Sequence, residues 1–324
     1  MFLAELPCYE GGHNEAKRCV DCEKRQSCGL ELPDAVLADA RVHVVRGNVR
    51  LPKRRPETHK GDYGKVLLLG GSVGYTGAPS LCAQAAVAAG AGLVYLGVPE
   101  AIYTIEAVKN VEAMPFPLPS DENGRMAEKA VGKLPERCKG MDVIAAGCGF
   151  GRGEGVKAVT RWLLETWKDP LVLDADALWA LAEDISMADK TEAQLVLTPH
   201  EGEFSRLWPE RSGDRLADAR AFAAAHRCTL VLKGHRTLIA FPDGEVYAVA
   251  AGNAGMARGG SGDVLTGVIA GMLGQTDFRE AVVTACWLHA RAGDIAAENM
   301  SEYAVTPSVI LGTLMLAQRE IIEK

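Results

Sequence analysis

The stretch KVLLLGGSVGYTGAPSLCAQAAVAAGAGLVYLGV, residues 65–98, contains two apolar runs of strand length, separated by a glycine-rich turn and an alanine-rich segment. The runs at 65–70 and 92–98 are apolar almost throughout, a pattern typical of parallel strands buried on both faces of a sheet. The segment at 79–90 has helical length and joins the two runs as a helix joins the strands of a β-α-β unit. The stretch therefore predicts a parallel sheet with helices packed against it.

The same alternation of apolar runs and helical segments continues along the chain. Further strands are predicted at 142–147, 170–175, 194–199 and 229–234, and helices at 155–167, 214–226, 264–274 and 279–299. Residues 237–250 contain two short runs around a Pro-Asp-Gly turn, which indicates a β-hairpin. The predicted fold class is α/β, a doubly wound, mostly parallel sheet flanked by helices. Ligands of such sheets bind beyond the carboxyl ends of the strands, so the loops there are the candidate site.

Composition excludes some classes of partner. The 324 residues are 48% hydrophobic and 24% charged, as in ordinary soluble globular proteins. The net charge of −7 gives no support for nucleic-acid binding, which requires a basic face. Residues 78–98 have the length of a membrane span, but their alanine and glycine content favours a buried helix and a buried strand. No secretory leader pattern opens the chain, so we expect a cytoplasmic protein with neither a nucleic-acid nor a membrane partner.

The beginning of the chain is polar and rich in cysteine, with one helix-like piece at 33–45. We predict a cysteine-rich extension over 1–50, followed by the α/β domain over 51–324. Four cysteines in the extension have the spacing C-x10-C-x2-C-x5-C: Cys8, Cys19, Cys22 and Cys28. This spacing is compatible with a structural zinc ion or an iron–sulfur cluster. Free thiols in a flexible tail are the alternative interpretation.

The stretch GNAGMARGGSGDVLTGVIAGML, residues 252–273, has seven glycines and a single acid, Asp263; the glycines become sparser after Asp263, where a helix-like run begins. Backbone N–H groups that converge before a helix form an anion site, most naturally for phosphate. A carboxylate beside such a site suits a base that removes a proton from a hydroxyl attacking a phosphoryl group. Local sequence equally allows Asp263 to be a cap of the following helix.

Six ordered motifs share a resemblance to one family. GGSGDVLTG resembles the anion-hole and catalytic-base motif of the ribokinase-like superfamily. Together with HKGDYGKVLLLGGS, YTGAP, LDADAL, LTPHEGEF and LKGHRT, it is similar to the NAD(P)H-hydrate dehydratase family over about residues 51–320. The resemblance implies a ribokinase-like fold and a lyase that repairs hydrated NADH or NADPH. The nucleotide, ADP in most bacteria and ATP in eukaryotes, acts with Mg²⁺ and phosphorylates the ring hydroxyl, and phosphate then leaves.

The resemblance also implies a role for individual residues. Asp263 would deprotonate the ring hydroxyl, and backbone N–H groups would hold the phosphoryl group: those of Gly260, Ser261 and Gly262. The hydrated ring would contact Ala78, Gly149, His200 and Asp263. The nucleotide would be bound by Lys233, Gly234, His235, Arg236, Thr237 and Gly262. Glu203 would order the Mg²⁺ shell through water, and Asp174 would either serve the phosphate region or cap the next helix.

This chain departs from the family's pattern at two places, and other functions remain open. Cys148 stands where the family more often has proline, and His235 and Arg236 where a small residue is common. A kinase of the same fold that acts on a hydroxymethylpyrimidine- or hydroxyethylthiazole-type vitamin precursor would need the same Asp263. A non-catalytic adenine-nucleotide sensor would not depend on that acid. The family commonly forms tetramers, and its epimerase activity is here expected from another protein.

Overall fold

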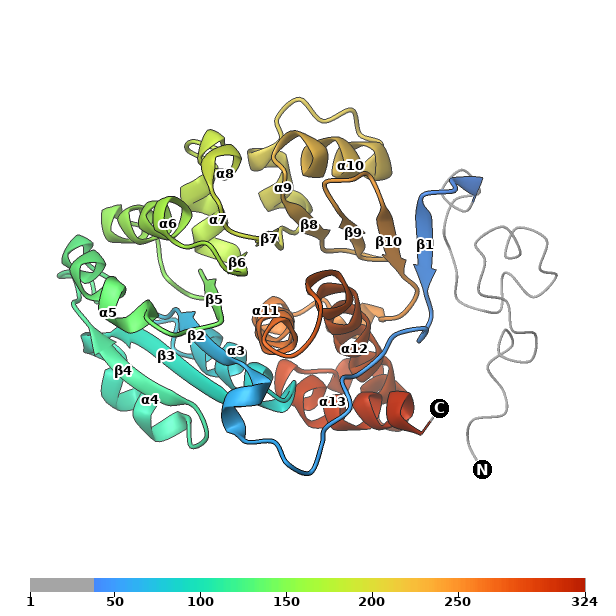
Figure 1. Cartoon of the computed structure of the whole chain (residues 1–324), viewed down its shortest axis with the longest axis horizontal. Helices are drawn as coiled ribbons and strands as arrows, with labels where there is room; N and C mark the ends of the chain where they lie inside the picture. Colours follow the sequence, from blue (N-terminus) through green and yellow to red (C-terminus); the bar gives the residue numbers. More distant parts are fainter. Residues whose placement is uncertain (1–37, 324) are drawn as a thin grey trace.

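The strands of residues 38–323, the part of the chain that the computed structural model describes, make one ten-stranded sheet (Figure 1). In chain order the strands are β1 Val42–Val45, β2 Lys65–Leu69, β3 Leu93–Pro99, β4 Met114–Leu118, β5 Val143–Ala146, β6 Leu171–Leu173, β7 Leu195–Leu197, β8 Thr229–Leu232, β9 Leu238–Ala240 and β10 Val246–Val249. Their order across the sheet is β1-β10-β9-β8-β7-β6-β5-β2-β3-β4. The predicted metal site of the amino-terminal cysteines lies outside the described residues.

The sheet is doubly wound, as predicted. From β2 the chain moves outward through β3 to β4, then returns to the other side of β2 and continues through β5, β6, β7 and β8. Every described pairing in this series is parallel, and only β9 pairs antiparallel, with β8 and with β10. The chain reverses its direction of winding between β2 and β5, which is where such sheets bind ligands. The six predicted strands and the hairpin β9–β10 are confirmed.

Helices cover both faces. One face carries α3 Gly77–Ala88, α4 Tyr103–Lys109, α11 Ser261–Leu273, α12 Phe278–Asn299 and α13 Pro307–Ile322. The other carries α5 Leu134–Cys138, α6 Glu154–Thr166, α7 Ala175–Leu181, α8 Ser186–Lys190, α9 Glu201–Leu207 and α10 Arg215–Ala225. Strand β2 feeds both layers, since Val66 and Leu68 face the first core and Leu67 and Leu69 the second. None of the helices within residues 38–323 is long and apolar enough to span a membrane.

Helix α11 packs closely on α3, beside the central strands (Figure 1). Its Gly267 makes this approach possible, because a Cβ atom at that position would lie 2.1 Å from the carbonyl oxygen of Cys82. The helix begins at Ser261, three residues before the predicted start at 264. Asp263 therefore lies within the first turn of the helix instead of preceding it.

Both outer strands differ from the prediction. Val42–Val45 form β1, which pairs in parallel with β10, so the helix-like interpretation of 33–45 is wrong for these four residues. Strand β4 was not predicted, because its sequence MPFPL contains two prolines. Proline lacks the N–H that a central strand needs, and β4 tolerates it as the last strand at its edge. A boundary at residue 50 would assign β1 to the extension, although this strand pairs with β10 of the sheet. The domain boundary at residue 50 stays a prediction.

Candidate active site

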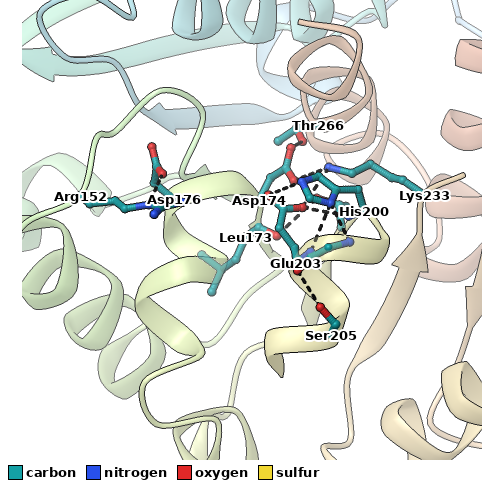
Figure 2. Close-up of polar contacts among 11 residues, drawn as sticks. Arg152, Leu173, Asp174, Asp176, His200, Glu203, Ser205, Lys233 and Thr266 are labelled. Atoms are coloured by element: carbon teal, nitrogen blue, oxygen red, sulfur yellow. Dashed lines mark hydrogen bonds and ion pairs between the residues drawn. The ribbon is translucent and has the colours of Figure 1, made fainter. Parts of the chain in front are cut away.

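The candidate site lies where β6, β7 and β8 end, facing the amino-terminal turns of α11 (Figure 2). The loops after β7 and β8 are joined there, because the N–H of Lys233 donates to the carbonyl oxygen of Pro199 at 2.9 Å. His200 and Lys233 form an isolated parallel bridge next to this bond. Residues from the LTPHEGEF and LKGHRT motifs, about 30 positions apart in sequence, thus come together at one edge of the sheet.

The amino end of α11 has the geometry of an anion site. Gly260 is the N-cap in the left-handed region, with φ of +98°, where a side chain would be strained. The N–H of Ser261 donates to the carbonyl oxygen of Arg258 at 3.3 Å, so a phosphoryl group has to compete with that carbonyl for it. The hydroxyl of Ser261 lies 3.3 Å from Nε2 of His289, and burial lowers the pKa of this histidine to about 4. A neutral imidazole therefore supports the turn.

Asp263 has the acid–base properties of a base that works near neutral pH. Burial is the main cause that raises its pKa to about 6, and the nearby carboxylate of Asp174 adds to the effect. A hydrogen bond with the Cys148 thiol and the charge of Lys233 act in the opposite direction. The thiol itself stays protonated, because its hydrogen bond with Cys82 and its burial raise the pKa of Cys148 well above the usual range. At pH 7 Asp263 is ionised and still basic enough to accept a proton.

Asp174 does not cap the next helix. It occupies the N-cap position of α7, but its side chain makes no capping hydrogen bond. The carboxyl group is buried and points toward α11 instead (Figure 2): Oδ1 accepts from Nζ of Lys233 at 2.7 Å and Oδ2 accepts from Oγ1 of Thr266 at 2.8 Å. The capping interpretation is therefore wrong, and a role in the phosphate region stays a prediction.

Lys233 lies at the floor of the anion site. A Cβ atom built on Gly262 would be 3.3 Å from Nζ of Lys233. Burial alone would lower the pKa of this lysine, but the carboxylates of Asp174 and Glu203 outweigh burial and raise it. Nζ is 3.9 Å from Oε2 of Glu203. Lys233 is therefore a permanently charged ammonium group next to the helix terminus.

His200 and Glu203 form a reciprocal cap on α9. Nδ1 of His200 accepts from the N–H groups of Gly202 and Glu203 at 3.0 and 3.2 Å, and Oε2 of Glu203 accepts from the N–H of His200 at 2.9 Å. The cap uses Nδ1 as an acceptor, and Nε2 on the other edge of the ring lies 3.5 Å from Oε1 of Glu203. The side chain of His200 is 59% exposed, so this edge is accessible to a ligand. The two residues predicted for substrate and Mg²⁺ thus also fix the start of a helix.

The predicted ring-binding residues Ala78 and Gly149 are neighbours. Gly149 has φ of +66°, and a Cβ atom there would lie 3.0 Å from Cβ of Ala78 and 2.9 Å from the carbonyl oxygen of Tyr75. The loop that holds Gly149 is anchored on both sides: Oγ of Ser72 donates to the carbonyl oxygen of Gly149 and the N–H of Gly71 to that of Cys148, each at 2.9 Å. This loop is held in place without the proline common in the family.

Arg215 fixes the predicted nucleotide loop. Its guanidinium donates to three backbone carbonyl oxygens: that of Leu232 at 2.9 Å, that of His235 at 3.2 Å and that of Arg236 at 2.7 Å. Its Nε also contacts Oε1 of Glu201 at 2.5 Å. Gly234 and Arg236 have φ of +154° and +59° inside the clamped segment. The loop conformation therefore depends on a side chain outside the motif.

Sequence reasoning missed several side chains of this site: Cys148 as a partner of Asp263, Asp176, Arg215, Thr266 and His289. Asp176 had a local signal, since it is the second acid of LDADAL, and its Oδ2 accepts from the N–H of Gly151 at 2.9 Å. The others act through contacts between distant segments, which no local pattern marks.

The doubly wound sheet and the anion site with its adjoining acid define a ribokinase-like protein. The fold is similar to that of a ribokinase-like superfamily protein of Enterococcus faecalis, with a TM-score of 0.77, 27% identity, and 87% of this chain and 97% of the other covered. The model of the NAD(P)H-hydrate dehydratase family matches residues 66–315. The chain belongs to this family, which confirms the resemblance seen in the sequence.

Relatives in this family are similar over most of this chain. The bifunctional NAD(P)H-hydrate repair enzyme Nnr of Moorella thermoacetica is 43% identical over 281 residues, 85% of this chain and 53% of that protein. An ADP-dependent (S)-NAD(P)H-hydrate dehydratase of Neisseria meningitidis is 37% identical over 76% of this chain and 81% of its own length. The structure of the ADP/ATP-dependent NAD(P)H-hydrate dehydratase of Bacillus subtilis, co-crystallised with ATP and Mg²⁺, has a TM-score of 0.72 and 32% identity over 84% of this chain and 95% of that one. The chain spans about half the length of the first curated relatives it matches.

Proposed function

We propose that the protein dehydrates hydrated NADH and NADPH, with an adenine nucleotide, ADP or ATP, as phosphoryl donor. Family membership supports this reaction, and the names of the Neisseria and Bacillus relatives state it for those proteins. The observation that carries the proposal is Asp263. It is a partly buried carboxylate whose pKa burial raises to about 6, in the first turn of a helix whose amino end can hold a phosphoryl group.

The proposed reaction has two stages. In the first, the ring hydroxyl attacks the terminal phosphorus of the nucleotide, its O–H proton passes to Asp263, and the bond to the shorter nucleotide breaks. The N–H groups of Gly260 and Gly262, the amino end of α11 and the ammonium of Lys233 stabilise the charge on the transferring group. In the second stage, phosphate leaves with the electron pair of the C–O bond and the neighbouring carbon loses a proton, which restores the ring double bond.

The charges around Lys233 fit a requirement for Mg²⁺. Three carboxylates lie around this one ammonium group: Asp174, Glu203 and Asp263. A nucleotide brings further negative charge, so a divalent cation is needed to offset the repulsion. Within residues 38–323 no group of three His, Cys, Asp or Glu side chains could hold a metal ion. Mg²⁺ commonly uses one or two carboxylates with phosphate and water, and Glu203 beside the phosphate region suits that pattern.

The hydrated ring is proposed to lie against Ala78 and Gly149, within reach of Nε2 of His200. Ala78 has a small side chain and Gly149 has none, which leaves space for a flat ring. The nucleotide is proposed to contact the backbone of the loop clamped by Arg215, at positions 233–237, and Gly262. His235 and Arg236 would contact the nucleotide through their backbone groups, so the contact does not depend on the identity of their side chains.

The test measures NADH produced from hydrated NADH. Purified protein, Mg²⁺ and hydrated NADH are mixed with ADP or ATP, and recovery of the near-ultraviolet absorbance of NADH is followed with phosphate release. We expect equal amounts of NADH and phosphate with at least one nucleotide, and none with Asp263→Asn. A phosphorylated product that accumulates would indicate the vitamin-precursor kinase. Nucleotide binding without any turnover, and unaffected by Asp263→Asn, would indicate a sensor.

Assembly and location remain predictions. A homotetramer is expected from the family resemblance, and light scattering during size-exclusion chromatography measures the mass that decides it. A cytoplasmic location is expected from the sequence, and fractionation of the source cells tests it.

A further inference from the structure

The buried carboxylate of Asp174 connects three separate elements. The residue follows β6, its Oδ1 binds Lys233 at the end of β8 at 2.7 Å, and its Oδ2 binds Thr266 in α11 at 2.8 Å. Asp174 is 1% exposed and Thr266 is fully buried. A buried ion pair is costly to desolvate, and apolar residues of similar size often stabilise a fold as well. The fold itself therefore does not require a carboxylate at this position.

A fixed position of the Lys233 side chain, in contrast, does require the carboxylate of Asp174. Without Asp174, the next acid for the ammonium is Glu203, whose Oε2 is 3.9 Å from Nζ. Glu203 lies on α9, whereas a Cβ atom built on Gly262, in the first turn of α11, would be 3.3 Å from Nζ. Loss of the bond to Asp174 would let the flexible lysine side chain turn from the helix terminus toward Glu203.

We propose that Asp174 is a positioning residue, which holds the ammonium of Lys233 beneath Gly262 so that it contacts the transferred phosphoryl group of the nucleotide. Thr266 fixes the second carboxylate oxygen and so sets the direction of the first. The proposal rests on the proposed function, because it takes the helix terminus as the place of the terminal phosphoryl group. According to this proposal, Lys233 contacts the transferred phosphoryl group and not the adenosine part of the nucleotide.

The same carboxylate also affects the base. Asp263 is faced by Cys148 from the loop after β5, by Asp174 and Asp176 from the segment after β6, and by Lys233 from the loop after β8. After burial, Asp174 is the strongest of these influences, and it raises the pKa of Asp263. Replacement of Asp174 by asparagine removes this influence whether or not Lys233 moves, so nucleotide binding, and not the pH profile of the reaction, tests the position of Lys233.

Calorimetric titration of Asp174→Asn with ADP and with AMP, both with Mg²⁺, tests the position of Lys233. The removal of the negative charge of Asp174 would by itself tighten the binding of the anionic nucleotide. A loss of affinity would therefore show that the ammonium group of Lys233 has changed its position. We expect ADP to bind about tenfold more weakly, since one charge-assisted contact is lost, and AMP, which lacks the terminal phosphoryl group, to bind as before. If ATP is the donor, the same comparison is made with ATP and ADP. Unchanged or tighter binding of the donor nucleotide would overturn the proposal.

Two matched variants complete the test. Asp243→Asn makes the same chemical change at a carboxylate that also pairs with a cation, Arg279, in the turn between β9 and β10, and should not weaken ADP binding. In a double-mutant cycle, Asp174→Asn should cost nothing further in a Lys233→Met background, whereas additive losses would show that Asp174 does not act through Lys233. If Asp174→Asn does not fold, Thr266→Val carries the same ADP comparison.

These binding measurements do not depend on turnover. A wild-type protein that binds ADP but restores no NADH refutes the proposed function, while the ADP-to-AMP comparison still decides the role of Asp174.

Discussion

Replacement of Asp263 by asparagine is expected to stabilise the fold while it abolishes the reaction. Burial, reinforced by Asp174, raises the pKa of Asp263 from 3.8 to about 6, so the folded protein holds this proton more tightly than the unfolded chain does. Below about pH 4 the carboxyl is protonated in both states and the stabilising effect of the proton is fully present. This effect is lost as the pH rises through about 6, because the carboxylate must then ionise in a buried place.

The size of the effect follows from the shift. A difference of about two pKa units corresponds to about 3 kcal/mol of unfolding free energy at pH 7.5, and to about half of that at pH 5. Asparagine has the same shape and no charge, so Asp263→Asn removes this cost. Because water and neighbouring groups relax around a buried charge, we expect a gain of about 1.5 to 3 kcal/mol at pH 7.5.

Urea unfolding followed by circular dichroism, at pH 7.5 and at pH 5, measures the gain. The control is Glu112→Gln, the same chemical change at an exposed carboxylate, which should alter the stability by less than about 0.5 kcal/mol at either pH. A variant that is no more stable than the wild type at pH 7.5, or whose gain does not shrink at pH 5, would refute the argument that burial of charge sets the basicity of Asp263.

Three further changes have defined outcomes. Because Asp263 must be ionised to accept a proton, kcat/KM, which reports on the free enzyme, should fall about tenfold per pH unit below about pH 6, and a flat kcat/KM profile down to pH 5 would contradict this role. Gly149→Ala should lower the free energy of unfolding by about 1 to 2 kcal/mol, because the residue has a positive φ, and thermal unfolding measures this loss. The new Cβ atom would also press on Ala78, so steady-state kinetics should show a higher KM for the hydrate. Arg215→Lys keeps the charge but loses the planar fork that holds three carbonyl oxygens, so the KM for the nucleotide should rise about tenfold while that for the hydrate stays constant.

The central strands could be predicted from sequence because burial on both faces leaves them almost continuously apolar. Strands such as Val143–Ala146 and Leu195–Leu197 are fully buried. The two outer strands lack this signal, since each has only one neighbour. In Met114–Leu118 the prolines even argue against a strand, and Val42–Val45 follow a segment with helical character.

The site could be predicted where a single segment carries the chemistry. Glycines that precede a helix and an acid in its first turn form one continuous motif, so Asp263 and its turn could be proposed as a site from the sequence alone. The partners that control this acid come from far away in the chain: Asp174 is 59 residues from Lys233 and 92 from Thr266. No periodicity links such positions, and only the topology of the sheet brings them together.

The backbone construction of the anion site matters for the base beside it. Burial and Asp174 favour the protonated form of Asp263, whereas Lys233 and the amino end of α11 favour the ionised form, and the balance leaves the pKa at about 6. A phosphoryl group bound there adds negative charge and makes the carboxylate a stronger base when a hydroxyl proton has to be removed. Additional arginine or lysine side chains would bind phosphate more tightly, but they would lower the pKa of Asp263 and weaken it as a base. In the proposed reaction, glycine N–H groups would hold the phosphoryl oxygens without adding a full positive charge, which would reconcile anion binding with a basic carboxylate at the same helix terminus.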